Sequence, residues 1–309
     1  MRAHTHTFGR QLKSTSLDVL DKFLTFESRI FIFLRKHSFL HKEAKKKKQC
    51  CMSGMMWDTF LTGVAELIGT AILIFVGCMG CVGSLGVSPP HVQITLSFGL
   101  AVMIVIQCFA HISHAHVNPA MTLGAVVLGK KTITEASIYL VSQLIGAVLG
   151  FGLLKLVTPT GQLYSGKPDA APLFCVTNIH ATMSVVQGLI VEAMTTGILM
   201  LVACAVWDVR NSSNTDSVAI KFGLSVTALA TVAGPYTGCS MNPARSFAPA
   251  IWNNQWDNHW IYWLGPLGGS FLAALTYRMV FGYKTIEDDE TIPESIRRRT
   301  LKDLSVSPR

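Results

Sequence analysis

The sequence contains Asn118-Pro119-Ala120 and, 124 residues later, Asn242-Pro243-Ala244-Arg245. Asn is a good helix N-cap, and Pro fits the first position of a helix. Each tripeptide opens a short apolar run, about 118–128 and 242–252. As a helix rising about 1.5 Å per residue, such a run is roughly 16 Å long, whereas the hydrocarbon core of a bilayer is about 30 Å thick. We therefore expect two half-helices with their N-termini at membrane mid-depth.

A single Asn-Pro-Ala tripeptide would indicate only a capped helix. Two copies in matching halves of a hydrophobic chain indicate more, because irregular backbone at membrane depth is tolerated only where it lines a cavity or is buried in protein. Paired interrupted segments are the sequence pattern that marks a transport site. We expect Asn118 and Asn242 to lie together at the midplane of a pore.

The composition predicts a membrane protein. Half of the 309 residues are hydrophobic and 14% are charged, with a mean hydropathy of +0.41, which is too apolar for an ordinary soluble domain of this size. The net charge of +8 is concentrated in the tails. Cytoplasmic flanks of a membrane protein account for this better than nucleic-acid binding does.

The eight cysteines show no metal-ligand spacing, and no metal or other cofactor is predicted. No disulfide framework is predicted either. Several cysteines lie in apolar runs, where a free thiol behaves as a small hydrophobic side chain. These are Cys78, Cys81, Cys108 and Cys204.

Apolar segments divide the chain into two similar halves. The predicted membrane spans are 57–85, 92–109, 136–157, 183–207, 218–233 and 260–281. Each half, 57–157 and 183–281, holds three spans and one half-helix, so the second half must be inverted in the membrane. The expected fold is all-α, with six transmembrane helices and two re-entrant half-helices.

The chain outside the spans is expected to form two tails. A basic N-terminal tail (1–56) precedes a channel domain (57–283), and a C-terminal tail (284–309) follows it. Lys and Arg crowd both tails, Lys130-Lys131 and the connection near Arg210, whereas the connection 86–91 has neither residue. This asymmetry predicts that both termini are cytoplasmic.

Two acidic residues lie within predicted spans, where a charge must face protein or water. Glu66 precedes Asn118 by a distance similar to that by which Glu192 precedes Asn242. The matched positions suggest a shared role, which is to accept hydrogen bonds from backbone N–H groups of the re-entrant loops. A proton relay is the alternative, although no chain of titratable groups connects them. His116, just before the first Asn, is interpreted as a loop-supporting side chain.

Arg245 lies one turn into the second half-helix, away from the cytoplasmic charge clusters. It is either an Arg that reaches to the membrane surface or a fixed charge beside a narrow polar pore. In the second case it would donate hydrogen bonds to permeant oxygens and exclude cations.

These residues resemble the aquaporin (major intrinsic protein) family over about 57–283. The stretches that match are His111-Ile112-Ser113, Ala115-His116-Val117-Asn118-Pro119-Ala120, Tyr236-Thr237-Gly238-Cys239, Met241-Asn242-Pro243-Ala244-Arg245-Ser246-Phe247 and His259-Trp260-Ile261-Tyr262-Trp263-Leu264-Gly265-Pro266. One departure is His114, where the family commonly has Gly.

The resemblance implies a homotetramer with a pore in every subunit. Asn118 and Asn242 would donate to a permeating water from opposite sides, and the two helix N-termini would make the midplane positive, which opposes protons and cations. Loop carbonyls would offer acceptors to permeating molecules. These belong to His114, Ala115, His116, Gly238, Cys239 and Ser240.

The resemblance also implies a selectivity constriction. Its register falls on Phe98, Ala230, Cys239 and Arg245. Strict water channels usually have His at the second of these positions, so Ala230 should give a wider and more apolar opening. A water-channel scaffold with a small residue at this position resembles the insect entomoglyceroporins.

The predicted function is a passive channel, in the membrane lipid of the plasma membrane, for water and small uncharged solutes such as glycerol and urea. A water-selective channel is one alternative. A non-conducting adhesion or signalling protein of the same fold is another, which the intact tripeptides and Arg245 argue against. An enzyme is not expected, because the sequence has no nucleophile–base constellation and no phosphate-binding Gly loop.

Overall fold

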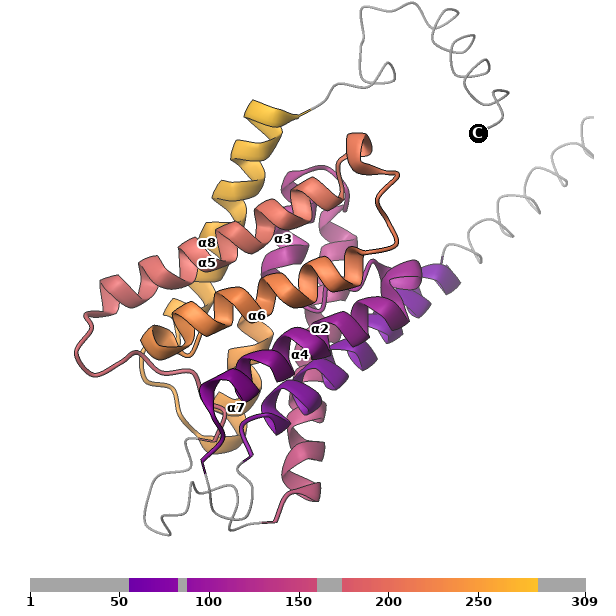
Figure 1. The fold of residues 1–309 in the computed structure, drawn as a ribbon. Helices are drawn as coiled ribbons and strands as arrows, with labels where there is room; N and C mark the ends of the chain where they lie inside the picture. The colour runs from indigo at the N-terminus through magenta and orange to yellow at the C-terminus, as the bar shows by residue number, and fades with distance from the viewer. Residues whose placement is uncertain (1–55, 83–87, 160–173, 283–309) are drawn as a thin grey trace, which may run out of the picture. The chain divides into compact units, whose positions relative to one another are not determined.

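The computed structural model describes residues 56–82, 88–159 and 174–282. Residues 1–55 of the predicted N-terminal tail and all of the C-terminal tail lie outside the described residues. The regular structure in the described ranges is helical (Figure 1). Its elements are Met56–Met79, α2 (His91–Ser113), α3 (Pro119–Val127), α4 (Ile133–Val157), α5 (Val185–Val206), η2 (Val209–Asn211), α6 (Val218–Thr237), α7 (Pro243–Asn253), α8 (Ile261–Thr276) and the π-helical η3 (Tyr277–Phe281).

Five of the described helices are long and apolar enough to cross a membrane. They are Met56–Met79, α2, α4, α5 and α6. The predicted sixth span corresponds to α8, which is shorter than these five helices and is continued by η3. Large apolar side chains, such as Leu156, Val186 and Leu272, are exposed on these helices. Such outer surfaces suit a lipid environment.

Two helices run further than the sequence predicts. α2 continues past the predicted end at 109 to Ser113, and α6 continues past the predicted end at 233 through Pro235 to Thr237. A Pro inside a helix leaves the carbonyl four residues earlier without its N–H partner. That carbonyl belongs to Thr231, and Nε2 of His91 on α2 donates to it at 2.9 Å. This contact between α2 and α6 thus gives a donor to the carbonyl that Pro235 leaves unpaired in α6.

Small residues allow the helices to approach closely. α2 packs on α6, and α5 packs on α8. A Cβ at Gly99 would collide with the backbone carbonyl of Gly223, and one at Gly269 would collide with the carbonyl of Ala193. Such contacts are typical of helix pairs in membranes, where association depends on close packing.

Each short helix packs against the opposite half of the chain. α3 lies against α8, and α7 lies against α4. The hydroxyl of Ser270 on α8 donates to the carbonyl of Ala120 at 2.6 Å, and Nε1 of Trp252 on α7 donates to the carbonyl of Val148 on α4 at 2.9 Å. The two halves therefore complete one another.

One prediction about the cysteines is wrong. Cys78 is not a free thiol, because it forms a disulfide with Cys175. The two residues are 97 positions apart in sequence, and only the packing of the segment before α5 against the first helix brings them together. Within the described residues, Cys81, Cys108, Cys204 and Cys239 are free.

The connection between α5 and α6 is tied to the end of η3. Nη2 of Arg210 donates to Asp208 and, at 2.7 Å, to the carbonyl of Phe281, and the hydroxyl of Tyr277 donates to Asp208 at 2.9 Å. The Arg210 guanidinium holds the pKa of the Asp208 carboxyl well below its usual value. The carboxylate therefore stays ionised at neutral pH and can keep both partners.

Candidate functional site

Asn118 and Asn242 are the N-caps of the two half-helices. Oδ1 of Asn118 accepts from the backbone N–H of Ala120 at 2.8 Å. Oδ1 of Asn242 accepts from Ala244 at 3.0 Å and from Arg245 at 3.4 Å. The oxygen of each amide is thereby fixed on its own helix, which leaves the NH₂ group pointing away from that helix.

Glu66, buried in the first helix (Met56–Met79), accepts hydrogen bonds from the loop before α3. Its carboxylate receives the backbone N–H of His116 at 2.9 Å and that of Val117 at 2.7 Å. It also accepts from the hydroxyl of Ser113 at 2.7 Å and from Nε2 of Gln143 at 2.8 Å. A fully buried carboxylate needs such donors, because its desolvation is otherwise uncompensated.

Glu192 in α5 makes the corresponding contacts in the second half. Its carboxylate accepts from the backbone N–H of Ser240 at 2.8 Å and of Met241 at 2.9 Å, and from the hydroxyl of Thr237 at 2.6 Å. Both carboxylates therefore bind two consecutive N–H groups that irregular backbone leaves unpaired. None of these contacts joins Glu66 to Glu192.

Each half also has one tyrosine whose hydroxyl donates to the carbonyl at the end of the helix before the loop. The hydroxyl of Tyr139 donates to the carbonyl of Ser113 at 2.6 Å, and the hydroxyl of Tyr262 donates to the carbonyl of Thr237 at 3.0 Å. In each loop a later helix of the same half thus supports the residue at which the preceding helix ends.

The two loops share an unusual backbone. Three residues in each have positive φ, at corresponding positions: His114, Ala115 and Val117 in the first loop, and Gly238, Cys239 and Met241 in the second. Positive φ is uncommon for residues other than Gly. His114 caps α2 in the left-handed conformation, as Gly238 caps α6. The unusual His114 therefore leaves the turn intact.

This backbone leaves a series of carbonyls without internal donors. In the described part of the chain, no hydrogen bond reaches the backbone carbonyls of the six residues predicted as acceptors. His114, Ala115 and His116 line one cavity, while Gly238, Cys239 and Ser240 line another. An unpaired backbone carbonyl in a residue that lines a cavity can accept a hydrogen bond from a polar molecule there.

His116 is buried beside the first loop. Its Nδ1 lies 3.2 Å from Oγ1 of Thr122, and its ring contacts those of Tyr139 and Trp207 at centroid distances of 4.8 and 5.3 Å. These contacts fix the ring in one place. Nearby, Oε1 of Gln143 is the one buried side-chain polar atom without a partner in the described residues.

Two cavities in the described part of the chain share some of their lining residues. One of about 260 Å³ includes Asn118, Asn242 and the first loop in its lining. The other, of about 400 Å³, is lined by all four residues predicted for the constriction, which are Phe98, Ala230, Cys239 and Arg245. Phe98 and Arg245 line both cavities, so these two side chains lie where the cavities meet.

Arg245 is 6% exposed and is held by two neighbours. Its guanidinium carbon lies 4.7 Å from the centre of the Phe98 ring. Its Nη1 donates to the backbone carbonyl of Cys175 at 2.8 Å. A guanidinium over an aromatic face with a carbonyl partner has a defined position.

Cys175 and its neighbours are absent from the residues predicted for the site. Nothing local marks them, because the acceptor is a backbone carbonyl in a polar connection far from Arg245 in sequence. The only sequence signal was a pair of cysteines, Cys78 and Cys175, without any spacing rule. Within the described ranges, no cluster of three or more His, Cys, Asp or Glu could hold a metal ion.

Known proteins resemble this chain over most of its length. A family model described as Major intrinsic protein matches residues 55–277. Aquaporin-4 of Mus musculus is 36% identical over 246 residues, which cover 78% of this chain and 74% of that protein. Lens fiber major intrinsic protein of Ovis aries is 39% identical over 214 residues, which cover 69% and 78%.

A solved structure has the same fold. The aquaglyceroporin from Plasmodium falciparum matches with a TM-score of 0.65 and 24% sequence identity, covering 72% of this chain and 97% of that chain. At this level of identity the likeness concerns the fold alone.

Paired, Asn-capped half-helices within an all-helical membrane bundle define a channel rather than an enzyme. The chain belongs to the major intrinsic protein family, the aquaporins. It is therefore a multi-pass integral membrane protein and a channel of the kind that conducts water.

Proposed function

We propose that this channel passively conducts water together with small uncharged solutes such as glycerol and urea, and excludes protons and ions. The observation that carries the proposal is the small side chain of Ala230 in the wall of the cavity that also contains Phe98, Cys239 and Arg245. A methyl group there leaves room and an apolar surface for the carbon face of a polyol.

The polar side of the path consists of donors and acceptors in sequence. Arg245 and the amides of Asn118 and Asn242 are donors, and the unpaired loop carbonyls are acceptors. Permeating molecules exchange hydrogen bonds with these groups in place of bulk water, so the cost of dehydration is offset along the path.

Two features support the exclusion of protons and cations. The N-termini of α3 and α7 converge near Asn118 and Asn242, and both present the positive end of a helix dipole. The buried charge of Arg245 adds a second electrostatic barrier in a low-dielectric wall. Neither barrier depends on the side chain at position 230, so a wider opening for neutral solutes leaves both in place.

The assembly and topology are part of the same proposal. Four copies form a homotetramer in the plasma membrane, each with its own pore in the channel domain 57–283. The tails 1–56 and 284–309 are cytoplasmic, in agreement with the distribution of Lys and Arg. The subfamily that combines these features is the entomoglyceroporin-like one.

Solute uptake into proteoliposomes tests the proposal. Purified protein should raise the permeability to water, urea and glycerol, whereas a pH-sensitive dye inside the vesicles should report no proton entry. Water uptake without glycerol or urea uptake would favour a water-selective channel. Vesicles no more permeable to water than protein-free ones would favour the non-conducting alternative.

A further inference from the structure

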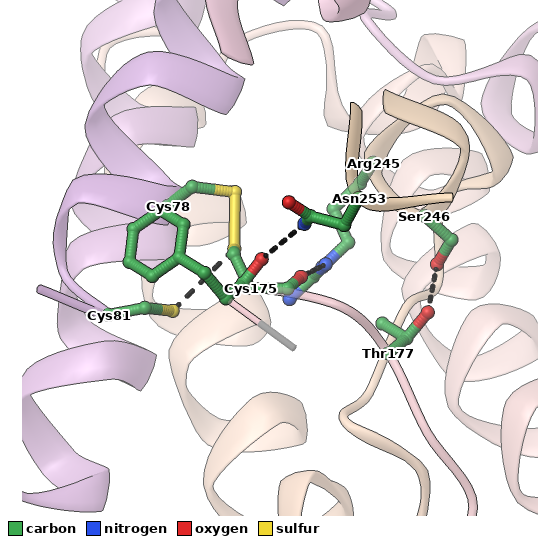
Figure 2. The surroundings of a disulfide bond; sticks show 8 residues. Cys78, Cys81, Cys175, Thr177, Arg245, Ser246 and Asn253 are labelled. Atoms are coloured by element: carbon green, nitrogen blue, oxygen red, sulfur yellow. Dashed lines mark hydrogen bonds between the residues drawn. A yellow bond between two sulfur atoms is a disulfide. The ribbon is translucent and has the colours of Figure 1, made fainter. Parts of the chain in front are cut away.

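The segment that follows residue 173 is fastened at several points beside the constriction. Figure 2 shows the disulfide that joins Cys175 to Cys78 in the first helix. Nδ2 of Asn253 on α7 donates to the carbonyl of Phe174 at 3.1 Å. Two elements from different halves of the chain thus hold two consecutive residues of this connection.

The same residue, Cys175, supplies the carbonyl that accepts from Nη1 of Arg245 (Figure 2). Its φ is 57°, a left-handed conformation that residues other than Gly adopt only when their surroundings hold them there. The direction of this carbonyl therefore depends on what restrains Cys175, and the disulfide is its covalent restraint.

We propose that the Cys78–Cys175 disulfide is a positioning element of the constriction, and that reducing it lets Arg245 narrow the channel. For glycerol and urea this inference rests on the proposed function, but its effect on water does not. No contact between the disulfide and a permeating molecule is required, because the disulfide acts through the Cys175 carbonyl.

The chemistry of the step is simple. A dithiol such as dithiothreitol gives up two hydrogens and becomes a cyclic disulfide, while the sulfur–sulfur bond breaks and Cys78 and Cys175 become thiols. Cys175 then relaxes from its left-handed conformation, and its carbonyl turns away from the guanidinium. The Phe98 ring occupies one side of Arg245, so the released side chain moves into the cavity space on the other side.

A third cysteine, Cys81, determines which variants are informative. Sγ of Cys81 lies 3.6 Å from Sγ of Cys175, and both residues line the 400 Å³ cavity, which gives a small reductant a route to the bond. If Cys78 alone is replaced, Cys81 is close enough to pair with Cys175 instead. The informative variants are therefore Cys175→Ala, which keeps the backbone carbonyl, and the double variant Cys78→Ala/Cys81→Ala.

The first experiment measures wild-type proteoliposomes before and after dithiothreitol treatment, with thiols counted by alkylation and mass spectrometry. We expect reduction to lower the glycerol-to-water permeability ratio by about tenfold or more, the size expected from losing one hydrogen bond to a charged group. Water permeability should fall as well, by a smaller factor. An unchanged or higher ratio with unchanged water permeability, after confirmed reduction, would overturn the inference.

The second experiment compares variants without reductant. Cys175→Ala and the double variant should both behave like the reduced wild type, whereas Cys108→Ala, which removes an exposed thiol, should remain sensitive to dithiothreitol. Arg245→Val should be insensitive, because it has no guanidinium to release. Sensitivity of Arg245→Val equal to that of wild type would contradict the route through Arg245.

The outcome also separates this inference from the proposed function. If oxidised wild type passes water but no glycerol or urea, the proposed solute range is wrong. A fall in water permeability on reduction, absent in Arg245→Val, would still support the positioning role of the disulfide.

Discussion

Asn118 and Asn242 each donate one amide hydrogen to the loop that carries the other. Nδ2 of Asn118 lies 2.8 Å from the carbonyl of Met241, and Nδ2 of Asn242 lies 2.9 Å from the carbonyl of Val117. Each NH₂ group has a second hydrogen. The first hydrogen joins the N-terminal ends of the two half-helices, and we propose that the second donates to a molecule in the pore.

Replacing Ala230 with His should suppress glycerol and urea flux while largely sparing water. The imidazole fills space in the cavity wall that Phe98 and Arg245 also line. A few extra atoms in a tight site change the discrimination between two permeating molecules roughly tenfold or more. Stopped-flow measurements on proteoliposomes give the permeabilities. Ala230→Ser is the matched control, because it adds polarity without bulk and should still pass glycerol. Equal glycerol flux in folded Ala230→His and wild type would refute the selectivity argument.

Mercurial reagents should inhibit the channel by binding Cys239. Cys239 lines the 400 Å³ cavity together with Arg245, so a mercury atom attached to it would obstruct the path. Water permeability after treatment should be restored in Cys239→Ser. The matched control is Cys81→Ser, which removes the other free cysteine lining that cavity and should leave the channel inhibited. If Cys81→Ser is the resistant variant instead, the reactive thiol is Cys81.

Arg245→Val should raise glycerol flux and admit a small proton leak. The substitution removes the fixed charge and widens the region next to Phe98, while the converging helix N-termini remain. Current under a pH gradient in voltage-clamped cells, with surface expression matched, measures the leak. Wild type should show no such current, and a sizeable one would contradict both electrostatic barriers at once.

Glu192→Gln should destabilise the protein. One carboxylate oxygen becomes an NH₂ group that faces backbone N–H donors, so at least one buried donor loses its acceptor, at a cost of about 1–3 kcal/mol. Thermal unfolding in detergent measures the loss. Glu135→Gln is the control, because Gln also serves in the capping box that Glu135 makes with Thr132. Similar unfolding temperatures for the two variants would argue against the role of Glu192 in supporting the loop.

Local signals in the sequence predicted much of the fold. The lengths of the apolar segments located the spans. An N-capping Asn followed by Pro located the starts of α3 and α7, because these two features act within one turn of helix. The ends of α2 and α6 were placed too early. The polar residues there look like loop, yet Ser113 and Thr237 are bound by the buried carboxylates and tyrosines of other helices.

The sequence by itself determined an all-helical membrane channel with two capped half-helices, because hydrophobic length and capping chemistry depend on neighbouring residues. Only the tertiary structure decided the Cys78–Cys175 disulfide and the carbonyl partner of Arg245. It likewise decided the hydrogen bonds that Asn118 donates to the Met241 carbonyl and Asn242 donates to the Val117 carbonyl. Each of these joins atoms from segments distant in sequence, and their distances and directions follow from helix packing. Every residue has a backbone carbonyl, so no residue type in the sequence could predict which carbonyl accepts from Arg245.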